Sequence, residues 1–141
     1  MNQPKKYTSG LNQKDKKKQI QSLKKSIRAY KTKKGKDKYY KRPKLKSFKE
    51  KKSSWTTKFK NKYPNAKTIT QIAKATGIPR KALLAVKKKG MGAYYSSGSR
   101  PNQTPHSWGM ARMYSYILGG PTRKIDKHIT KKYNVKFKHS N

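Results

Sequence analysis

The sequence predicts a mainly α-helical protein, in which a small module of about four to five short helices follows a long, irregular, Lys-rich N-terminal arm. Only 30% of the 141 residues are apolar, and the net charge of +36 repels itself, so the buried core must be small. The apolar residues recur at helical spacing between Gly and Pro residues, which are typical of helix ends. We place the arm at residues 1–65, the helical module at 66–134 and a tail at 135–141.

The arm is expected to contain one amphipathic helix, over about residues 12–31. Asn12 can cap this helix, and Asp15 lies in its first turn, where the positive end of the helix dipole favours an acidic side chain. The narrow apolar stripe of this helix consists of Ile20, Leu23, Ile27 and Tyr30. Because lysines cover the rest of its surface and repel one another, the helix needs a partner surface or a bound polyanion.

Residues 32–64 show no regular apolar period and predict an extended strap. Its apolar side chains are spaced singly among lysines, and they are Tyr39, Tyr40, Leu45, Phe48, Trp55, Phe59 and Tyr63. Such a segment can wrap a nucleic-acid strand, with rings stacked on bases and ammonium groups on phosphates. It can equally be a strap whose aromatic side chains fill pockets on a neighbouring protein, and both interpretations stay open.

Residues 69–89 are expected to form a helical hairpin. Thr70 caps the first helix, and Gly77 ends it because glycine tolerates the left-handed backbone of a helix end. Pro79 suits the first turn of the second helix, which we expect to end at Gly90. The three lysines before Gly90 would then lie at the negative end of that helix, where cations are favoured.

Residues 69–88 also resemble the helix-turn-helix pattern, in which the small Ala73 lets the two helices approach. The apolar packing positions of the pattern are Ile72, Ile78, Leu83 and Val86. If the hairpin binds DNA, Arg80, Lys81 and Ala82 lie where base edges would be met. Few exposed positions are Asn, Gln or Arg, which argues against base reading. A DNA-contacting unit and a purely structural hairpin therefore both stay open.

Residues 90–122 contain no Lys, Asp or Glu, although lysine supplies 34 of the 141 residues. Glycines and serines predict a loop over about 90–99, followed by a helix at 105–118 that two glycines stop. This helix is apolar around much of its circumference, and we expect it to be buried together with Trp108. The side chains expected to pack or dock are Tyr94, Tyr95, Trp108, Tyr114 and Trp55.

A last helix is expected from Thr122 to about Tyr133, with Ile125 and Ile129 facing the core. The final residues then form the tail.

The charge balance predicts a polyanionic partner, because four acidic residues cannot offset forty basic ones. Lysine outnumbers arginine 34 to 6, and lysine acts as a point charge rather than a bidentate reader of bases, which favours sequence-independent neutralisation. The candidate polyanion-binding residues are Arg80, Lys81, Lys87, Lys88, Lys89, Arg100, Arg112, Lys16, Lys17, Lys18, Lys24 and Lys25. For Arg100 and Arg112, a carbonyl or carboxylate is the alternative partner.

Catalysis is not expected. Ser96, Ser97, Arg100 and His106 lie close in sequence, but a serine hydrolase also needs a base oriented by a carboxylate. The acidic residues and histidines are scattered and cysteine is absent, so neither a metal centre nor a cofactor site is predicted.

The run GAYYSSGSRPNQTPHSW, within residues 88–120, resembles the signature of an uncharacterised family of small Lys-rich proteins of large DNA viruses, notably those that infect algae. The Lys-rich opening of the chain is similar to the N-terminal half of that family. The resemblance implies a viral, virion-associated setting and brings no activity and no catalytic residues.

We therefore expect a non-enzymatic structural virion protein, a minor capsid or core component that bridges acidic partners. The expected partners are capsid or other virion proteins, nucleic acid bound without sequence preference, and an anionic membrane surface that the chain does not span. It would lie in the virion interior or on the inner capsid face, and in the host nucleus or cytoplasm during assembly. The alternative is a DNA-binding protein of the genome-condensing or helix-turn-helix type.

Overall fold

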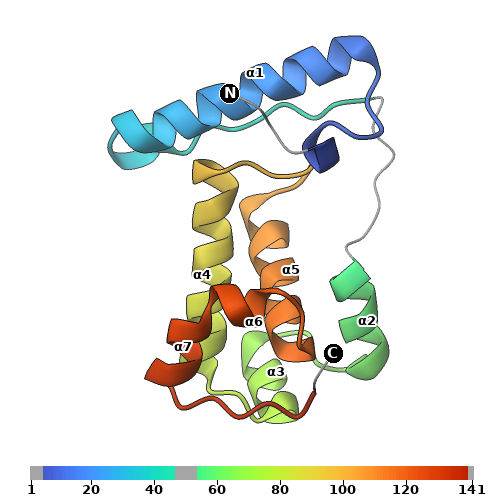
Figure 1. The fold of residues 1–141 in the computed structure, drawn as a ribbon, viewed down its shortest axis with the longest axis vertical. Coiled ribbons are helices and arrows are strands. Elements are labelled where there is room, and N and C mark those ends of the chain that lie inside the picture. The colour runs from blue at the N-terminus through green and yellow to red at the C-terminus, as the bar shows by residue number, and fades with distance from the viewer. Residues whose placement is uncertain (1–4, 47–53, 140–141) are drawn as a thin grey trace. The chain divides into compact units, whose positions relative to one another are not determined.

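The computed structural model describes residues 5–46 and 54–139, and within these ranges the chain is helical and contains no strand. The fold class is therefore mainly α, as predicted (Figure 1). The α-helices are α1 Gln13–Thr32, α2 Ser54–Lys62, α3 Ile69–Thr76, α4 Arg80–Ser96, α5 Pro105–Leu118, α6 Thr122–Ile125 and α7 Lys127–Lys132. Two 3₁₀ turns, η1 Lys5–Tyr7 and η2 Gly35–Lys38, flank α1.

The chain divides into two compact units, each built from segments that are distant in sequence. Unit 1 consists of Met1–Lys51 and Met91–Pro105, and unit 2 consists of Lys52–Gly90 and His106–Asn141. These boundaries differ from the arm, module and tail that we expected, because residues 91–105 group with the N-terminal segment. The long irregular arm itself is not confirmed.

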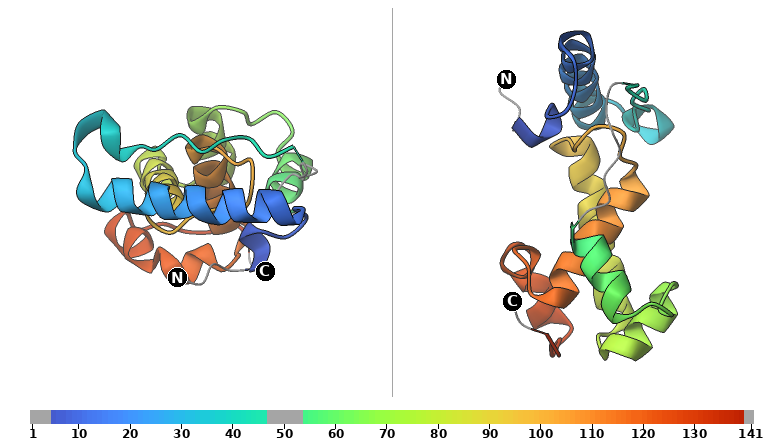
Figure 2. Two further views of the ribbon diagram at one scale, coloured as in Figure 1. Left: turned by 90° about the horizontal axis from the view of Figure 1, so that it is seen from above. Right: turned by 90° about the vertical axis from the view of Figure 1, so that its right-hand side faces the viewer.

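Helix α1 in unit 1 forms where the sequence predicts it. The Asn12 side chain caps it by accepting a hydrogen bond of 2.8 Å from the backbone N–H of Asp15. Leu23 and Ile27 of the expected stripe are buried. After η2 the chain turns back and runs alongside α1, as Figures 1 and 2 show. The helix thus packs against its own chain.

Helix α2 corrects the expected strap over its C-terminal part. Residues 54–62 are helical, and the Phe59 side chain is only 1% exposed. Its ring stacks on that of Tyr114, with 4.4 Å between the centroids. Phe59 is therefore part of the core of unit 2 and is not free to meet an external partner. Phe48, another expected anchor, lies outside the described residues.

Helices α3 and α4 form the expected hairpin at residues 69–89. Gly77 ends α3 in the left-handed conformation, with φ of +73°. The N-terminal cap is Thr68 and not Thr70: the Thr68 hydroxyl accepts a hydrogen bond from the Gln71 N–H, and the Gln71 side chain accepts one from the Thr68 N–H. This reciprocal pair of hydrogen bonds outweighs a cap two residues later.

Helix α4 does not end at Gly90 but continues to Ser96, so the loop expected over 90–99 is mostly helical. A Cβ atom added to Gly90 would lie 2.8 Å from the Cα of Gly109 in α5, closer than real Cβ contacts occur. Gly90 therefore allows α4 and α5 to approach, and it does not make a turn. The sequence pattern could not distinguish these two uses of glycine.

Replacing Gly90 with Ala should lower the free energy of unfolding by about 1–3 kcal/mol, because the new methyl group overpacks the α4–α5 contact. Gly92→Ala is the matched control: in the same helix, its Cβ would meet only the Tyr30 hydroxyl at 3.6 Å. Since alanine favours helix, this variant should be neutral or stabilised by up to about 1 kcal/mol. Urea unfolding of both variants measures the difference, and equal stabilities would contradict the close contact.

Helix α5 runs as predicted and stops at Gly119, whose φ is +87°. The predicted last helix is instead broken at Asp126 into α6 and α7. Ile129 is buried as expected, but Ile125 is 62% exposed, so its inward orientation was wrong. The break changes the helical register between the two isoleucines, and the Asp126 side chain takes the interior position.

Candidate polyanion-binding surfaces

Helix α1 carries a continuous row of cations on the face opposite its buried side. Its buried residues include Asp15, Gln19, Leu23 and Ile27. The exposed basic residues form what we call the α1 ridge, and they are Lys14, Lys17, Lys18, Lys24, Lys25, Arg28 and Lys31. At 1.5 Å per residue the ridge extends over about 25 Å. It includes the predicted residues except Lys16, which is partly buried at its edge.

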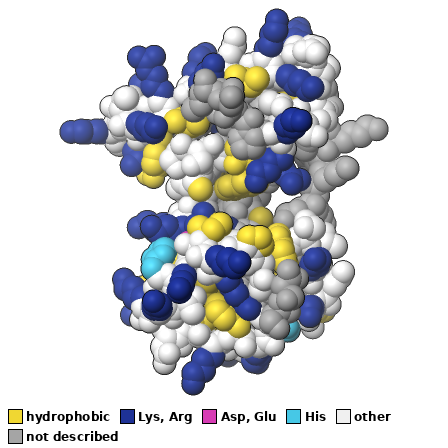
Figure 3. All heavy atoms as spheres, viewed as in Figure 1, with side chains coloured by type: hydrophobic (Ala, Val, Ile, Leu, Met, Phe, Trp, Pro, Cys, Tyr) yellow, Lys and Arg dark blue, Asp and Glu magenta, His cyan; other side chains and the backbone are white. Residues whose placement is uncertain are grey.

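Basic side chains also occur elsewhere on the surface. Figure 3 shows Lys and Arg side chains over the visible face of each unit, rather than gathered at one spot. Even if every acidic residue of the chain paired with a base, 36 of the 40 basic residues would stay uncompensated, which is the net charge. The surface thus suits a polymer of negative charge better than a single small anion.

Helix α4 presents a second basic strip in unit 2. Arg80, Lys81 and Lys88 are exposed. Leu84 lies between them and is 36% exposed, so the strip is partly apolar. These residues share one face of the helix by their spacing. Ala82, which we expected near base edges, is fully buried against the core, so it cannot contact a partner.

Lys87 and Lys89 flank this strip on either side of the helix, with Lys87 partly buried. Because α4 continues to Ser96, these lysines lie in the middle of the helix and not at its negative end. The favourable dipole contact expected for them is therefore absent.

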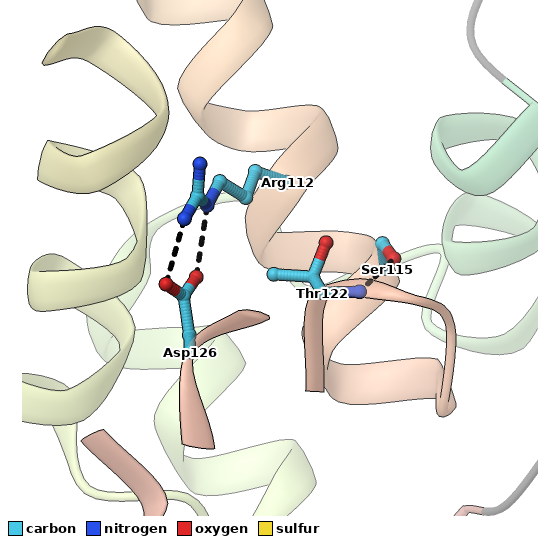
Figure 4. Close-up of polar contacts among 4 residues, drawn as sticks. All are labelled: Arg112, Ser115, Thr122 and Asp126. Carbon is cyan, nitrogen blue, oxygen red and sulfur yellow. Dashed lines mark hydrogen bonds and ion pairs between the residues drawn. The ribbon is translucent and has the colours of Figure 1, made fainter. Parts of the chain in front are cut away.

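Arg112 does not face solvent as a free cation. Its Nε and Nη2 donate hydrogen bonds of 2.8 and 2.7 Å to the two carboxylate oxygens of Asp126, whose side chain is 1% exposed (Figure 4). Of the partners that the sequence left open for Arg112, the structure shows the carboxylate. In the same view, the Ser115 hydroxyl lies 3.5 Å from the backbone N–H of Thr122, at the start of α6. Arg112 therefore links α5 to the α6–α7 junction.

The two adjacent tyrosines of the expected loop pack inside unit 1. Tyr95 stacks on Tyr30 of α1, with ring centroids 5.8 Å apart and the planes within 6°. The Tyr39 ring lies 4.9 Å from the ring of Tyr95, centroid to centroid, and Tyr39 is half exposed. Burial raises the pKa of Tyr95, chiefly because desolvation penalises the phenolate. Tyr94 is buried beneath the guanidinium of Arg42.

The other predicted packing residues lie in unit 2. Tyr114 is buried against Phe59, whereas Trp55 is partly buried beside Gly120. Trp108 is only partly buried and is not a member of the buried core, contrary to expectation. The fully buried aromatic of α5 is Tyr116, whose hydroxyl lies 2.7 Å from that of Thr130.

Unit 1 also contains a pocket of about 300 Å³ that sequence reasoning missed. Arg42 lies in its wall, with the guanidinium 3.6 Å above the centre of the Tyr94 ring. Its Nη2 donates a hydrogen bond of 2.6 Å to the backbone carbonyl of Tyr94, while Nε and Nη1 are buried and have no hydrogen-bond partner among the described residues. Arg100, a predicted anion-binding residue, is exposed at the same pocket.

The sequence did not distinguish Arg42 from its basic neighbours, Lys41 and Lys44. Only its burial distinguishes it: desolvation lowers the pKa of Arg42, while nearby phenol groups act in the opposite direction. The residue type could have identified this position, because arginine is scarce in this chain and lysine is its usual surface cation.

Within residues 5–46 and 54–139, no group of three or more His, Asp or Glu side chains could hold a metal ion. In the same ranges no helix has the length and apolar character needed to cross a bilayer.

A protein-family model described as "Family of unknown function (DUF5824)" matches residues 4–136, which is nearly the whole chain. No curated protein matches the chain, and neither does any solved structure.

Proposed function

The chain belongs to the DUF5824 family of unknown function, and we propose that it is a non-enzymatic structural protein that bridges acidic partners through its lysines. The observation that carries the proposal is the charge: forty basic residues against four acidic ones. Coulomb repulsion among so many cations is relieved when a polyanion is bound and its counterions are released. The α1 ridge and the α4 strip supply this surface on two separate units.

The setting that we propose is the virion of a large DNA virus, as a minor capsid or core component. The resemblance of the GAYYSSGSRPNQTPHSW run supports this setting. The proposed partners are the packaged DNA, acidic surfaces of capsid proteins and the anionic inner membrane face. Gentle disruption of purified virions tests the assignment: the protein should stay with the capsid shells, the inner membrane or the released genome, and its absence from all three would overturn it.

We expect the protein to bind mixed-sequence duplex DNA with an affinity that falls steeply with salt. Neutralising about six to ten phosphates would cost roughly a thousand-fold in affinity between about 50 and 200 mM salt. The variant Lys17→Glu/Lys24→Glu/Lys31→Glu on the α1 ridge should bind more weakly and show a shallower salt slope. Lys17→Arg/Lys24→Arg/Lys31→Arg is the control, because it keeps the charge and should bind like the wild type. Fluorescence anisotropy measures both.

The alternative is a DNA-binding protein of the helix-turn-helix type, and the α3–α4 hairpin favours it. Arg80, Lys81 and Lys88 are exposed along one face of α4, while Ile72, Leu83 and Val86 hold the hairpin together. The two proposals differ in sequence preference. On an array of mixed oligonucleotides, Arg80→Ala should weaken binding to all sequences equally if phosphates are the contact. A changed preference would favour the alternative.

A further inference from the structure

We propose that the pocket of unit 1 is a phosphate-binding site in which the buried guanidinium of Arg42 is the anchor. The inference deepens the proposed polyanion binding, because it assigns one residue that binds a single phosphate group by geometry rather than by bulk charge. It begins from the hydrogen bonds of Arg42, whose Nε and Nη1 are buried and meet no acceptor in the described part of the chain.

A buried guanidinium without an anion is unusual, since buried charges in proteins are paired or hydrogen-bonded. The other contacts of Arg42 are to neutral groups: the Tyr94 carbonyl and the face of the Tyr94 ring. No described lining residue is acidic, and Arg42 and Arg100 are basic. An anion in the pocket would compensate the charge of these two arginines.

The pocket is held in shape by hydrogen bonds between its walls. Asn102 pairs with the backbone of Leu45 twice, accepting from its N–H at 2.7 Å and donating to its carbonyl at 2.9 Å. Gln19 of α1 donates to the Ser99 carbonyl at 3.3 Å. The Tyr94 hydroxyl donates to the Gln103 carbonyl at 3.1 Å, which holds the ring beneath Arg42. The anchor is thus fixed before any ligand arrives, which lowers the entropic cost of binding.

Two features favour phosphate among anions. Two arginine side chains at one pocket, Arg42 and Arg100, suit the charge of about −1.5 to −2 of a phosphate monoester better than that of a single carboxylate. The volume of about 300 Å³ lies at the lower end of ligand pockets, which suits a phosphate with a small attached group. Burial raises the pKa of Tyr7, and the positive charges of Arg42 and Arg100 both act to lower it.

The phosphate could belong to a free nucleotide or to the backbone of a strand, and the test separates these sources. The full-length protein is titrated at about 150 mM salt, which screens the exposed lysines. The probes are inorganic phosphate, a deoxynucleoside 5′-monophosphate and a dinucleotide without terminal phosphate, and the readout is the NMR signal of the Arg42 Nε–H. Saturable shifts with the first two probes alone indicate a terminal phosphate, and shifts with the dinucleotide indicate a backbone phosphodiester.

Arg42→Lys keeps the charge but loses the fork of donors, so phosphate affinity should fall about tenfold or more. Lys33→Arg is the control, since Lys33 is an exposed cation of the same unit outside the α1 ridge and the substitution keeps its charge. If Arg42→Lys does not fold, Arg100→Gln at the exposed side of the pocket takes its place and should weaken phosphate binding several-fold.

The proposal is overturned if no probe shifts the Arg42 signal of the wild-type protein, or if Arg42→Lys binds phosphate as tightly as Lys33→Arg. Binding of long DNA separates this result from a failure of the proposed function. If the protein binds long DNA but no probe shifts the Arg42 signal, only the phosphate-site proposal is overturned. Phosphate binding without any affinity for long DNA removes the polyanion proposal alone.

Discussion

Replacing Arg112 with methionine should lower the free energy of unfolding by about 3–5 kcal/mol. The substitution leaves Asp126 as a buried carboxylate, 1% exposed, without the two hydrogen bonds of 2.8 and 2.7 Å that it now accepts. An uncompensated buried charge costs more than the ion pair contributes, so the loss exceeds that of an exposed salt bridge. Chemical denaturation followed by circular dichroism measures it.

The double variant Arg112→Met/Asp126→Leu is the control for this prediction. It removes both charges and fills the space with apolar side chains, so it should regain much of the stability lost in the single variant. If Arg112→Met costs less than about 1 kcal/mol, the carboxylate is solvated in solution and the link between α5 and the α6–α7 junction is weaker than the geometry indicates.

The second large effect is expected from Phe59→Ala, which should destabilise unit 2 by about 3–5 kcal/mol. Phe59 is 1% exposed and stacks on Tyr114, so its removal leaves a cavity and deletes a ring contact. The same measurement decides between the strap interpretation and the helix α2, because a side chain that met only an external partner would not stabilise the isolated protein.

Trp108→Ala is the comparison for Phe59→Ala. The sequence favoured Trp108 as a buried anchor, but the structure leaves it partly buried and outside the core of unit 2. Its replacement should therefore cost clearly less than that of Phe59, although the ring is larger. A larger cost for Trp108→Ala would contradict the observed core.

Sequence reasoning succeeded at several helix ends that depend on local chemistry, although it placed the N-terminal cap of α3 at Thr70 instead of Thr68. Asn12 caps α1, Gly77 ends α3 and Gly119 ends α5, all as predicted. Each of these depends on one side chain or on one φ value, which the neighbouring residues decide. The buried positions of the hairpin, Ile72 and Val86, followed from helical spacing in the same way.

Reasoning failed where one residue type has two structural uses. Glycine can make a turn or allow two helices to approach, and Gly90 does the second. An aromatic residue among lysines can stack on a ligand or fill a core, and Phe59 does the second. Local sequence is the same in both cases, because the deciding neighbours, Gly109 and Tyr114, lie 19 and 55 residues further along the chain.

The charge excess and the helical class follow from the sequence alone, since electrostatic repulsion and helix-end chemistry depend on composition and on near neighbours. Which arginines are available to an anion was decided by tertiary structure. Arg112 is paired with Asp126, whereas Arg42 is partly buried and two of its nitrogens have no acceptor within residues 5–46 and 54–139. Burial and pairing arise from contacts between distant segments, and a single sequence does not specify those contacts.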